Sequence, residues 1–244
     1  MIEVRHLHKS FGRVVAARDV SFTAPDGQIT GLLGPNGAGK TTTLRMLYTL
    51  LKPDQGTAIV DGFDVTTDAM EVQRRIGVLA DARGLYPRLT SRENIRYYGR
   101  LHGHRGDAFE KQIDSLITTL DMKDIADRRT EGFSAGERLK VAIARALAHN
   151  PRNVLLDEPT SGLDVMSTRA MRDVIRRLRD EGKCVLFTSH VMQEVAALCE
   201  HIVVMAKGSV VADGAPDDLR TQTGQANLED AFVVVIGSEE GLER

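Results

Sequence analysis

The segment GPNGAGKT at residues 34–41 carries the residue types that hold a phosphate. It fits the pattern G-x-x-x-x-G-K-[ST], and it lies between the apolar run QITGLLG, which predicts a strand, and KTTTLRMLYTLL, which predicts a helix ended by Pro53. Glycines let backbone N–H groups turn toward phosphate oxygens, and a helix N-terminus adds a favourable dipole. We expect Lys40 to reach the β and γ phosphates and the Thr41 hydroxyl to hold Mg²⁺. The residues predicted to contact the nucleotide here are Gly34, Pro35, Asn36, Gly37, Ala38, Gly39, Lys40, Thr41 and Thr42.

Two carboxylates follow the apolar run NVLLD. This run predicts a strand that delivers Asp157 to the carboxyl edge of a sheet, where ligands bind in open α/β folds. Asp157 is then placed to hold the metal, directly or through water. Glu158 comes next, and where the strand ends the chain can turn its side chain toward the phosphates. We therefore predict that Glu158 polarises an attacking water.

Ser134 lies in GFSAG, which fits the G-x-S-x-G pattern of a nucleophilic serine in α/β-hydrolases, and Asp164 and His190 follow in the hydrolase order. However, that nucleophile needs a buried strand before it, and the preceding KDIADRRTEGF is mostly charged. The residues after Ser134 predict an amphipathic helix, and Ser134 and Glu137 have capping-box spacing. We predict that Ser134 caps this helix and offers its N-terminus to an anion, with the hydrolase as a remote alternative.

The elements that must position these groups follow from the pattern of apolar residues. Runs at IGVLA, NVLLD and CVLFTS predict strands that alternate with helices, which favours a largely parallel sheet covered on both faces. Residues 2–24 predict two strands before a turn at 25–27. Residues 85–150 are helix-rich and too long for one crossover helix, so they predict an inserted subdomain. A helix, a hairpin around AKGSVVADG and a helical tail follow His190.

Composition limits the class of protein. The chain has 244 residues, 42% hydrophobic and 27% charged, and its formal net charge of -2 gives no general attraction to nucleic acid or an anionic membrane. The basic run MRDVIRRLRDEGK is interpreted as the solvated face of a helix, because its apolar residues form a stripe at helical spacing.

The N-terminus and the cysteines bear on location. The first ten residues lack the apolar core of a signal peptide, and no apolar run approaches the roughly 18 residues that a membrane span needs. Cys184 and Cys199 have no C-x-x-C spacing and are expected to be reduced and buried. We expect a cytosolic protein that reaches a membrane only through a partner.

The phosphate loop, FSAGE, LLDEPTSGLD and TSH occur in this order. In this combination the chain resembles the ATP-binding subunit of ABC transporters over nearly its whole length. The resemblance implies an α/β P-loop NTPase (RecA-like) core with a mostly parallel sheet, an N-terminal antiparallel β subdomain and an inserted α-helical subdomain. It implies one ATP-binding domain over residues 1–244, with the β subdomain and core at about 1–84 and 151–215, the helical subdomain at about 85–150 and a helical tail at about 216–244.

The resemblance also implies roles for single residues. Phe11 in KSFG would stack on adenine, or alternatively pack a small β subdomain. Asp164 in SGLD would couple the two active sites of a dimer, and His190 in TSH would hydrogen-bond the γ-phosphate and the attacking water. Ser134 and Gly136 would bind the γ-phosphate held by the opposite subunit.

One departure from the family pattern lies in the segment around Ser134. The family usually reads L-S-G-G-Q, and here Phe133, Ala135 and Glu137 replace three of the five residues. Glu137 brings a carboxylate close to the predicted phosphate site unless its cap bond turns it away. The strength of ATP-driven dimerisation is therefore open.

A second departure follows the strand IGVLA. The family usually has a glutamine there that touches Mg²⁺ and senses the membrane partner, and here the position is Asp81. Aspartate is one methylene shorter and, when ionised, only accepts hydrogen bonds, although it can bind Mg²⁺ through water. We expect slower or more weakly coupled hydrolysis.

Together these features predict an ATPase that binds ATP and Mg²⁺ and dimerises around two ATPs, most simply as a homodimer. It is expected to drive a separate integral-membrane permease from the cytoplasmic face of the membrane. The segment ARGLYPRLTSRENIRYYGRLHG, together with SHVMQEVAALC and the tail NLEDAFVVVIGSEEGL, resembles exporters of the sodium-efflux, ABC-2 type. The alternative is a soluble ABC ATPase acting on nucleic acid or ribosomes. It predicts a basic surface, paired cassettes or a long insertion, none of which the sequence shows, so no nucleic-acid partner is expected.

Overall fold

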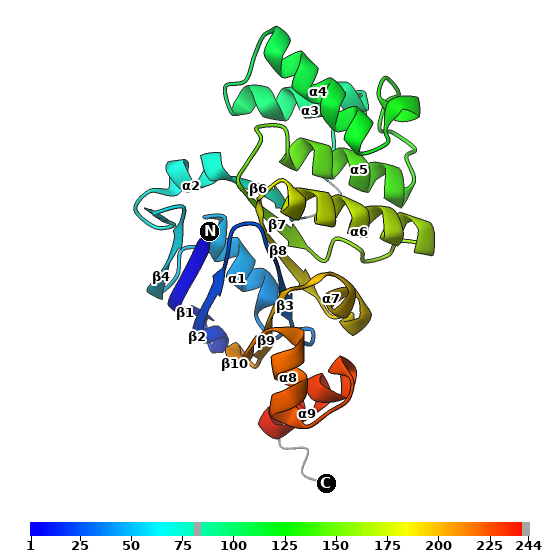
Figure 1. The fold of residues 1–244 in the computed structure, drawn as a ribbon. Helices are drawn as coiled ribbons and strands as arrows, with labels where there is room; N and C mark the ends of the chain where they lie inside the picture. The colour runs from blue at the N-terminus through cyan, green and yellow to red at the C-terminus, as the bar shows by residue number, and fades with distance from the viewer. Residues whose placement is uncertain (81–83, 241–244) are drawn as a thin grey trace.

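The computed structural model describes residues 1–80 and 84–240, and in these residues the strands form one sheet (Figure 1). The strand order is β5-β4-β1-β2-β10-β9-β3-β8-β7-β6. One part of the sheet is antiparallel and contains β1 (Ile2–Phe11), β2 (Val14–Ala24), β4 (Gln55–Val60) and β5 (Phe63–Asp64).

The other part of the sheet is mostly parallel. Its parallel strands are β9 (His201–Ala206), β3 (Ile29–Leu33), β8 (Cys184–Ser189), β7 (Asn153–Asp157) and β6 (Ile76–Leu79). The remaining strand, β10 (Ser209–Gly214), forms the predicted hairpin with β9 and meets β2 at one residue pair. All residues of β3 and β8 are buried, which explains why their sequences are mostly apolar, with Thr30, Thr188 and Ser189 as the buried polar residues.

Helices cover both faces of this sheet. In β7, Val154 and Leu156 belong to one hydrophobic cluster, whereas Leu155, between them, belongs to another on the opposite face. The first cluster includes side chains of α6 (Val165–Asp180) and α7 (Met192–Leu198), and the second includes side chains of α1 (Lys40–Leu47) and α2 (Ala69–Arg75). The predicted two-sided sheet is therefore present.

A helical region, residues 91–146, is inserted between β6 and β7 and lies at the top of Figure 1. It contains α3 (Ser91–Leu101), α4 (Asp107–Thr119), a short 3₁₀ helix (Lys123–Ile125) and α5 (Ala135–Ala146). The tail helices α8 (Pro216–Thr223) and α9 (Leu228–Glu240) lie at the opposite end of the molecule. None of the helices within 1–80 and 84–240 has the length and apolar character needed to cross a bilayer.

Two sequence predictions about helices need correction. Helix α1 ends at Leu47 rather than near Pro53, because Thr49 adopts a left-handed conformation (φ 65°) and the Leu50 N–H bonds back to the Arg45 carbonyl, 2.9 Å away.

The arginines of α6 are also not simply a solvated face. Arg172 Nη2 lies 2.8 Å from Oε1 of Glu194 on α7, and the Glu194 side chain is only 6% exposed. Arg177 Nη1 donates to the Thr119 carbonyl at the end of α4, 2.9 Å away. Long arginine side chains therefore fasten α6 to its neighbours. Cys184 and Cys199 are free and buried as expected, and burial raises the pKa of the Cys184 thiol to about 12.

Candidate functional site

The phosphate loop joins β3 to α1, and close packing requires two of its glycines. A Cβ on Gly34 would lie 2.3 Å from the Met205 carbonyl oxygen, and one on Gly39 would lie 2.2 Å from the Ala16 carbonyl oxygen. Gly39 also has φ 101°, which favours glycine. No described side chain caps the N-terminus of α1, and its first turn has no acidic residue. The first N–H groups of α1 are therefore available to an anion.

Lys40 lies over this loop. Its Nζ donates to the carbonyls of Gly34 (2.7 Å) and Pro35 (3.1 Å), and the residue is only 5% exposed. Burial lowers the pKa of the Lys40 ammonium, and the nearby charges of Glu158 and Asp157 oppose this shift. A buried cation that holds only neutral carbonyls favours the arrival of an anion such as a phosphate.

Asp157, at the end of β7, is held by two hydroxyl groups. Thr188 Oγ1 donates to Asp157 Oδ1 at 2.6 Å, and Thr41 Oγ1 donates to the same oxygen at 3.2 Å. Thr41, in the first turn of α1, therefore contacts Asp157, the last residue of β7, at the mouth of the phosphate loop. Thr188 is fully buried in β8, and sequence reasoning did not single it out.

Glu158 turns away from the strand. Its φ is 47°, a left-handed conformation that is uncommon outside glycine, and its N–H donates to Thr188 Oγ1 at 2.9 Å. Its carboxylate Oε1 lies 3.2 Å from His190 Nδ1, and the side chains are 30% and 45% exposed, respectively. A partly exposed carboxylate beside a histidine can accept a proton from water.

A cleft of about 500 Å³ connects these groups with the helical region. Thr41, Asp157 and Glu158 line one side, and Ala135 and Arg138 of α5 line the other. Arg138 donates to the Phe133 carbonyl. Its position brings a guanidinium to the cleft, a feature that the sequence analysis missed because Arg138 follows the recognised motif.

The oxygen atoms at this cleft suit a magnesium ion bound together with phosphates. In residues 1–80 and 84–240 no three His, Cys, Asp or Glu residues come together as a metal cluster. Mg²⁺ usually takes one or two protein ligands and completes its shell with water and substrate phosphates. The Thr41 hydroxyl and the Asp157 carboxylate meet that requirement. Asp81, predicted as a further ligand, lies outside the described residues.

Ser134 forms the N-cap of α5. Its hydroxyl accepts from the Glu137 N–H at 3.2 Å, and Glu137 Oε2 accepts from the Ser134 N–H at 2.8 Å. These bonds confirm the predicted capping box. The Ser134 N–H, helped by Arg128, lowers the pKa of the Glu137 carboxyl, so Glu137 is ionised at neutral pH. No strand leads into Ser134 and His190 pairs with Glu158 instead, so the α/β-hydrolase alternative is wrong.

Gly136 allows the start of α5 to pack closely against the start of α6. A Cβ on Gly136 would lie 2.9 Å from Ser167 Oγ. The Ser167 N–H and hydroxyl each donate to the Asp164 carboxylate at 2.9 Å, which makes Asp164 the N-cap of α6. The segment around Ser134 and the segment around Asp164 are thus in direct contact, and the glycine allows it.

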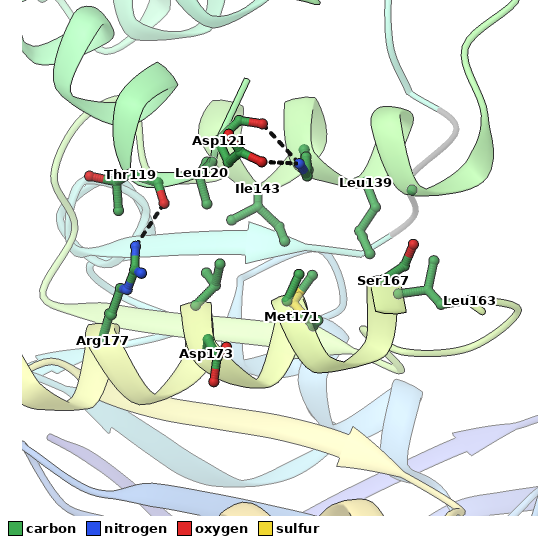
Figure 2. A pocket seen from close by; sticks show the side chains of 14 residues that line it. Thr119, Leu120, Asp121, Leu139, Ile143, Leu163, Ser167, Met171, Asp173 and Arg177 are labelled. Carbon is green, nitrogen blue, oxygen red and sulfur yellow. Dashed lines mark hydrogen bonds and ion pairs between the residues drawn. The ribbon is translucent and has the colours of Figure 1, made fainter. Parts of the chain in front are cut away.

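Beyond this contact, a cavity of about 180 Å³ separates α5 from α6 (Figure 2). Leu139 and Ile143 point into it from α5 and Met171 from α6, while Arg177 bonds to Thr119 at its far end. The helical region therefore rests on α6 through an incompletely filled interface. Such an interface resists relative movement less than a close-packed core would.

Phe11 lies at the end of β1 and is not a member of either hydrophobic cluster of the described residues. Its side chain is 47% exposed, and Lys9 Nζ lies 5.7 Å from the ring centroid. The predicted alternative, a ring packed in the β subdomain, does not fit this exposure. An open aromatic face beside a lysine is suited to a flat anionic ligand.

Comparison with known proteins identifies the class. Residues 17–161, more than half of the chain, match the family model described as ABC transporter. The chain belongs to the ABC transporter family. It is 46% identical over 221 residues to the ABC transporter ATP-binding protein NatA of Bacillus subtilis (strain 168), covering 90% of each chain. It is also 38% identical over 218 residues to the Nod factor export ATP-binding protein I of Burkholderia lata, covering 89% of this chain and 72% of that protein.

A solved ABC structure shares the architecture. The dimeric post-hydrolysis state of the ATP-binding cassette MJ0796, bound to ADP and Pi, matches with a TM-score of 0.79 at 26% identity, covering 88% of this chain and 98% of that one. The predicted α/β P-loop NTPase fold class is therefore confirmed. This ABC subunit is an ATPase whose hydrolysis is coupled to transport.

Proposed function

We propose that this ABC subunit closes as a homodimer around two ATP molecules and drives a separate ABC-2-type export permease at the cytoplasmic face of the membrane. The observation that carries the proposal is the group of residues at the mouth of the phosphate loop. There the uncapped start of α1, Lys40, the Asp157 carboxylate and the Glu158–His190 pair occupy neighbouring positions. Together they supply the groups that phosphoryl transfer to water needs.

In this proposal each residue has a distinct task. The first N–H groups of α1 and the Lys40 ammonium bind the phosphates, and Lys40 exchanges its two carbonyl partners for phosphate oxygens. Thr41 and Asp157 would hold Mg²⁺, which when bound neutralises negative charge on the phosphates. Glu158 orients the attacking water and accepts its proton, and His190 fixes the Glu158 carboxylate and reaches the γ-phosphate.

The dimer is proposed because Ser134 offers a second anion site on a different helix. The α5 N-terminus would receive the γ-phosphate bound to the other subunit, with Gly136 and Asp164 beside it. The dimeric state of the cassette MJ0796 supports the dimer itself. Asp164 would couple the two ATP sites of the dimer through its bonds to Ser167, which lies against Gly136.

The permease is proposed to dock on an exposed aromatic surface formed by α3 of the helical region and the segment that precedes it. Tyr86 and Tyr97 are 44% and 41% exposed, and their rings meet edge to face with centroids 5.0 Å apart. They line a cleft of about 590 Å³ together with Pro87, Leu89 and charged residues at its rim. Exposed aromatic side chains that surround a depression favour a protein partner.

Export is proposed from the relatives. One relative is named for Nod factor export, and the resemblance of residues 82–103 to sodium-efflux exporters suggests sodium as the first substrate to test. The permease determines the substrate path, so the nucleotide site carries no information about it.

The proposed chemistry is tested by Glu158→Gln. The amide keeps the size of the side chain but cannot take a proton from water. ATP binding should therefore persist, while ATPase activity falls to a small fraction of the wild-type rate and an ATP-bound dimer accumulates. Glu229→Gln on α9 makes the same change away from the site and should leave activity unaltered. Wild-type turnover in Glu158→Gln would remove Glu158 from the mechanism.

A further inference from the structure

Thr188 contacts both carboxylate residues of the site through a single hydroxyl group. It lies in β8 directly opposite Asp157 of β7 in the parallel register, and it is fully buried. Its Oγ1 accepts from the Glu158 N–H at 2.9 Å and donates to Asp157 Oδ1 at 2.6 Å. A hydroxyl has one hydrogen to donate, so these two bonds fix its orientation completely.

We propose that Thr188 is a positioning residue that holds Asp157 and Glu158 as one unit. The proposal rests on the function proposed above for these two carboxylates, and it assigns a task to the threonine of the TSH segment, in which only His190 was given a role. Thr188 touches neither nucleotide nor water in this account. It acts only through its two neighbours.

The first effect concerns the backbone of Glu158. A left-handed conformation is strained for a residue with a side chain, and such strain persists only where surrounding bonds enforce it. The bond from the Glu158 N–H to Thr188 supplies that constraint. Without it the chain can relax to negative φ, which would swing the carboxylate away from His190 Nδ1, now 3.2 Å away.

The second effect concerns the orientation of Asp157. Thr188 and Thr41 both donate to Oδ1, so among the described residues no side chain or backbone donor occupies Oδ2. The carboxylate is thereby held with one oxygen engaged by the protein and the other open toward the cleft. Partners of this kind typically change metal affinity or activity by about 10- to 100-fold when they are removed.

The chain contains a matched control. Thr30 lies in β3, next to β8 in the same sheet, and is equally buried, but its hydroxyl has no hydrogen-bond partner in the described structure. Thr30→Val and Thr188→Val therefore remove the same atom from the same kind of environment. Only the second substitution removes bonds to the site.

The experiment compares the full-length chain with Thr188→Val, Thr188→Ser and Thr30→Val. Thr188→Val should lower kcat by about 10- to 100-fold with the KM for ATP little changed. It should also shift a Mg²⁺ titration of equilibrium ATP binding, measured without turnover, to higher Mg²⁺. Thr188→Ser keeps the hydroxyl and should restore both readouts, and Thr30→Val should match the wild type.

Three results would overturn the proposal: wild-type kcat and Mg²⁺ dependence in Thr188→Val, equal losses in Thr30→Val, or no rescue by Thr188→Ser. If Thr188→Val does not fold, Thr188→Ala and Thr188→Ser are compared, and equal kcat in these two would also overturn it. Glu158→Gln is assayed in parallel. Full turnover in Glu158→Gln would refute the proposed function, whereas its inactivity beside an active Thr188→Val would refute only the role of Thr188.

Discussion

Two ionisable residues that are largely shielded from solvent in this ABC subunit, Lys40 and His149, differ in what surrounds them. Lys40 is buried close to two carboxylates, whose charges partly oppose the effect of burial on its pKa. His149 is half-buried and has no carboxylate beside it to favour its charge: its Nε2 donates to the Ile76 carbonyl at 2.9 Å, its Nδ1 has no partner among the described residues, and its ring stacks on His102 at 3.8 Å. The surroundings of Lys40 suit the binding of an anionic ligand, whereas those of His149 favour the neutral side chain.

The His149 environment predicts how stability depends on pH. Burial, and then the charge of His102, lower the pKa of His149 to about 4, with His104 and Lys183 adding in the same direction. The unfolded chain, with a histidine pKa of about 6.5, binds the proton first. The free energy of unfolding should therefore decrease as pH falls from about 6.5 to about 4.

His149→Gln tests this prediction, because glutamine can still donate to the Ile76 carbonyl but does not titrate. Urea unfolding at pH 7 and pH 5 should show a smaller loss of stability in this variant than in the wild type. His6→Gln, at a histidine that is 80% exposed, should change the loss little. An equal loss in His149→Gln and the wild type would contradict the assigned pKa.

At the scale of elements, the start of α1 and the start of α5 differ as anion sites. The α1 N-terminus has no described side-chain cap, whereas at α5 the Glu137 carboxylate occupies the Ser134 N–H. That N–H is one of the groups that would receive the partner's γ-phosphate. In the proposed dimer Glu137 would thus compete for the site and repel the phosphate, and Arg128, 3.3 Å from its Oε1, would offset only part of that charge.

Glu137→Gln should therefore strengthen ATP-dependent dimerisation. The amide oxygen still accepts from the Ser134 N–H, but the charge is gone. Two charges about 4 Å apart interact by about 1 kcal/mol in water-like surroundings, which corresponds to about fivefold per site. The effect is measured by sedimentation with ATP, which compares dimer formation of the Glu158→Gln protein with and without the additional Glu137→Gln substitution.

Glu93→Gln provides the matched control, because Glu93 forms the same capping box with Thr90 at the start of α3. Adding Glu93→Gln to the Glu158→Gln protein should leave its ATP-dependent dimerisation unchanged. Unchanged or weaker dimerisation of the Glu137→Gln protein would show that the carboxylate does not hinder the phosphate.

Some features of the fold and the site could be predicted from the sequence, and others could not. The capping box of Ser134 and Glu137 and the phosphate loop were predicted because their bonds join residues a few positions apart. The end of α1 was not, because a left-handed threonine such as Thr49 has no clear sequence signal. Thr188 was missed for another reason: a buried threonine in an apolar strand resembles ordinary β-branched packing, and its role depends on which strand lies beside it.

At the scale of the whole molecule, the proposed site draws on two parts of the chain, the sheet and the helical region. The phosphate loop and β7 belong to the sheet, while Ser134 belongs to the helical region that rests on α6 over a partly open cavity (Figure 2). We propose that ATP binding closes one such molecule on another and that hydrolysis reopens the pair. The helical region, with Tyr97 on α3 and Tyr86 in the segment just before α3, would pass this motion to the permease.

The central claim is that Ser134 completes the site of the other subunit, and a mixture of two inactive variants tests it most directly. Lys40→Ala destroys the phosphate loop of its own chain, and Ser134→Arg blocks the anion site offered to the partner. Each homodimer then lacks an intact site. A heterodimer has one whole site, in which the Ser134→Arg chain supplies the loop and the Lys40→Ala chain supplies the serine.

ATPase activity and ATP-dependent dimerisation are measured on each variant alone and on an equal mixture under conditions shown to exchange subunits. Random mixing makes about half of the dimers heterodimeric, so about a quarter of wild-type sites should be restored, with lower activity if both sites must act together. Each variant alone should be inactive. If the mixture recovers neither dimerisation nor hydrolysis, each site is completed within its own chain, and the role assigned to Ser134 across the dimer is wrong.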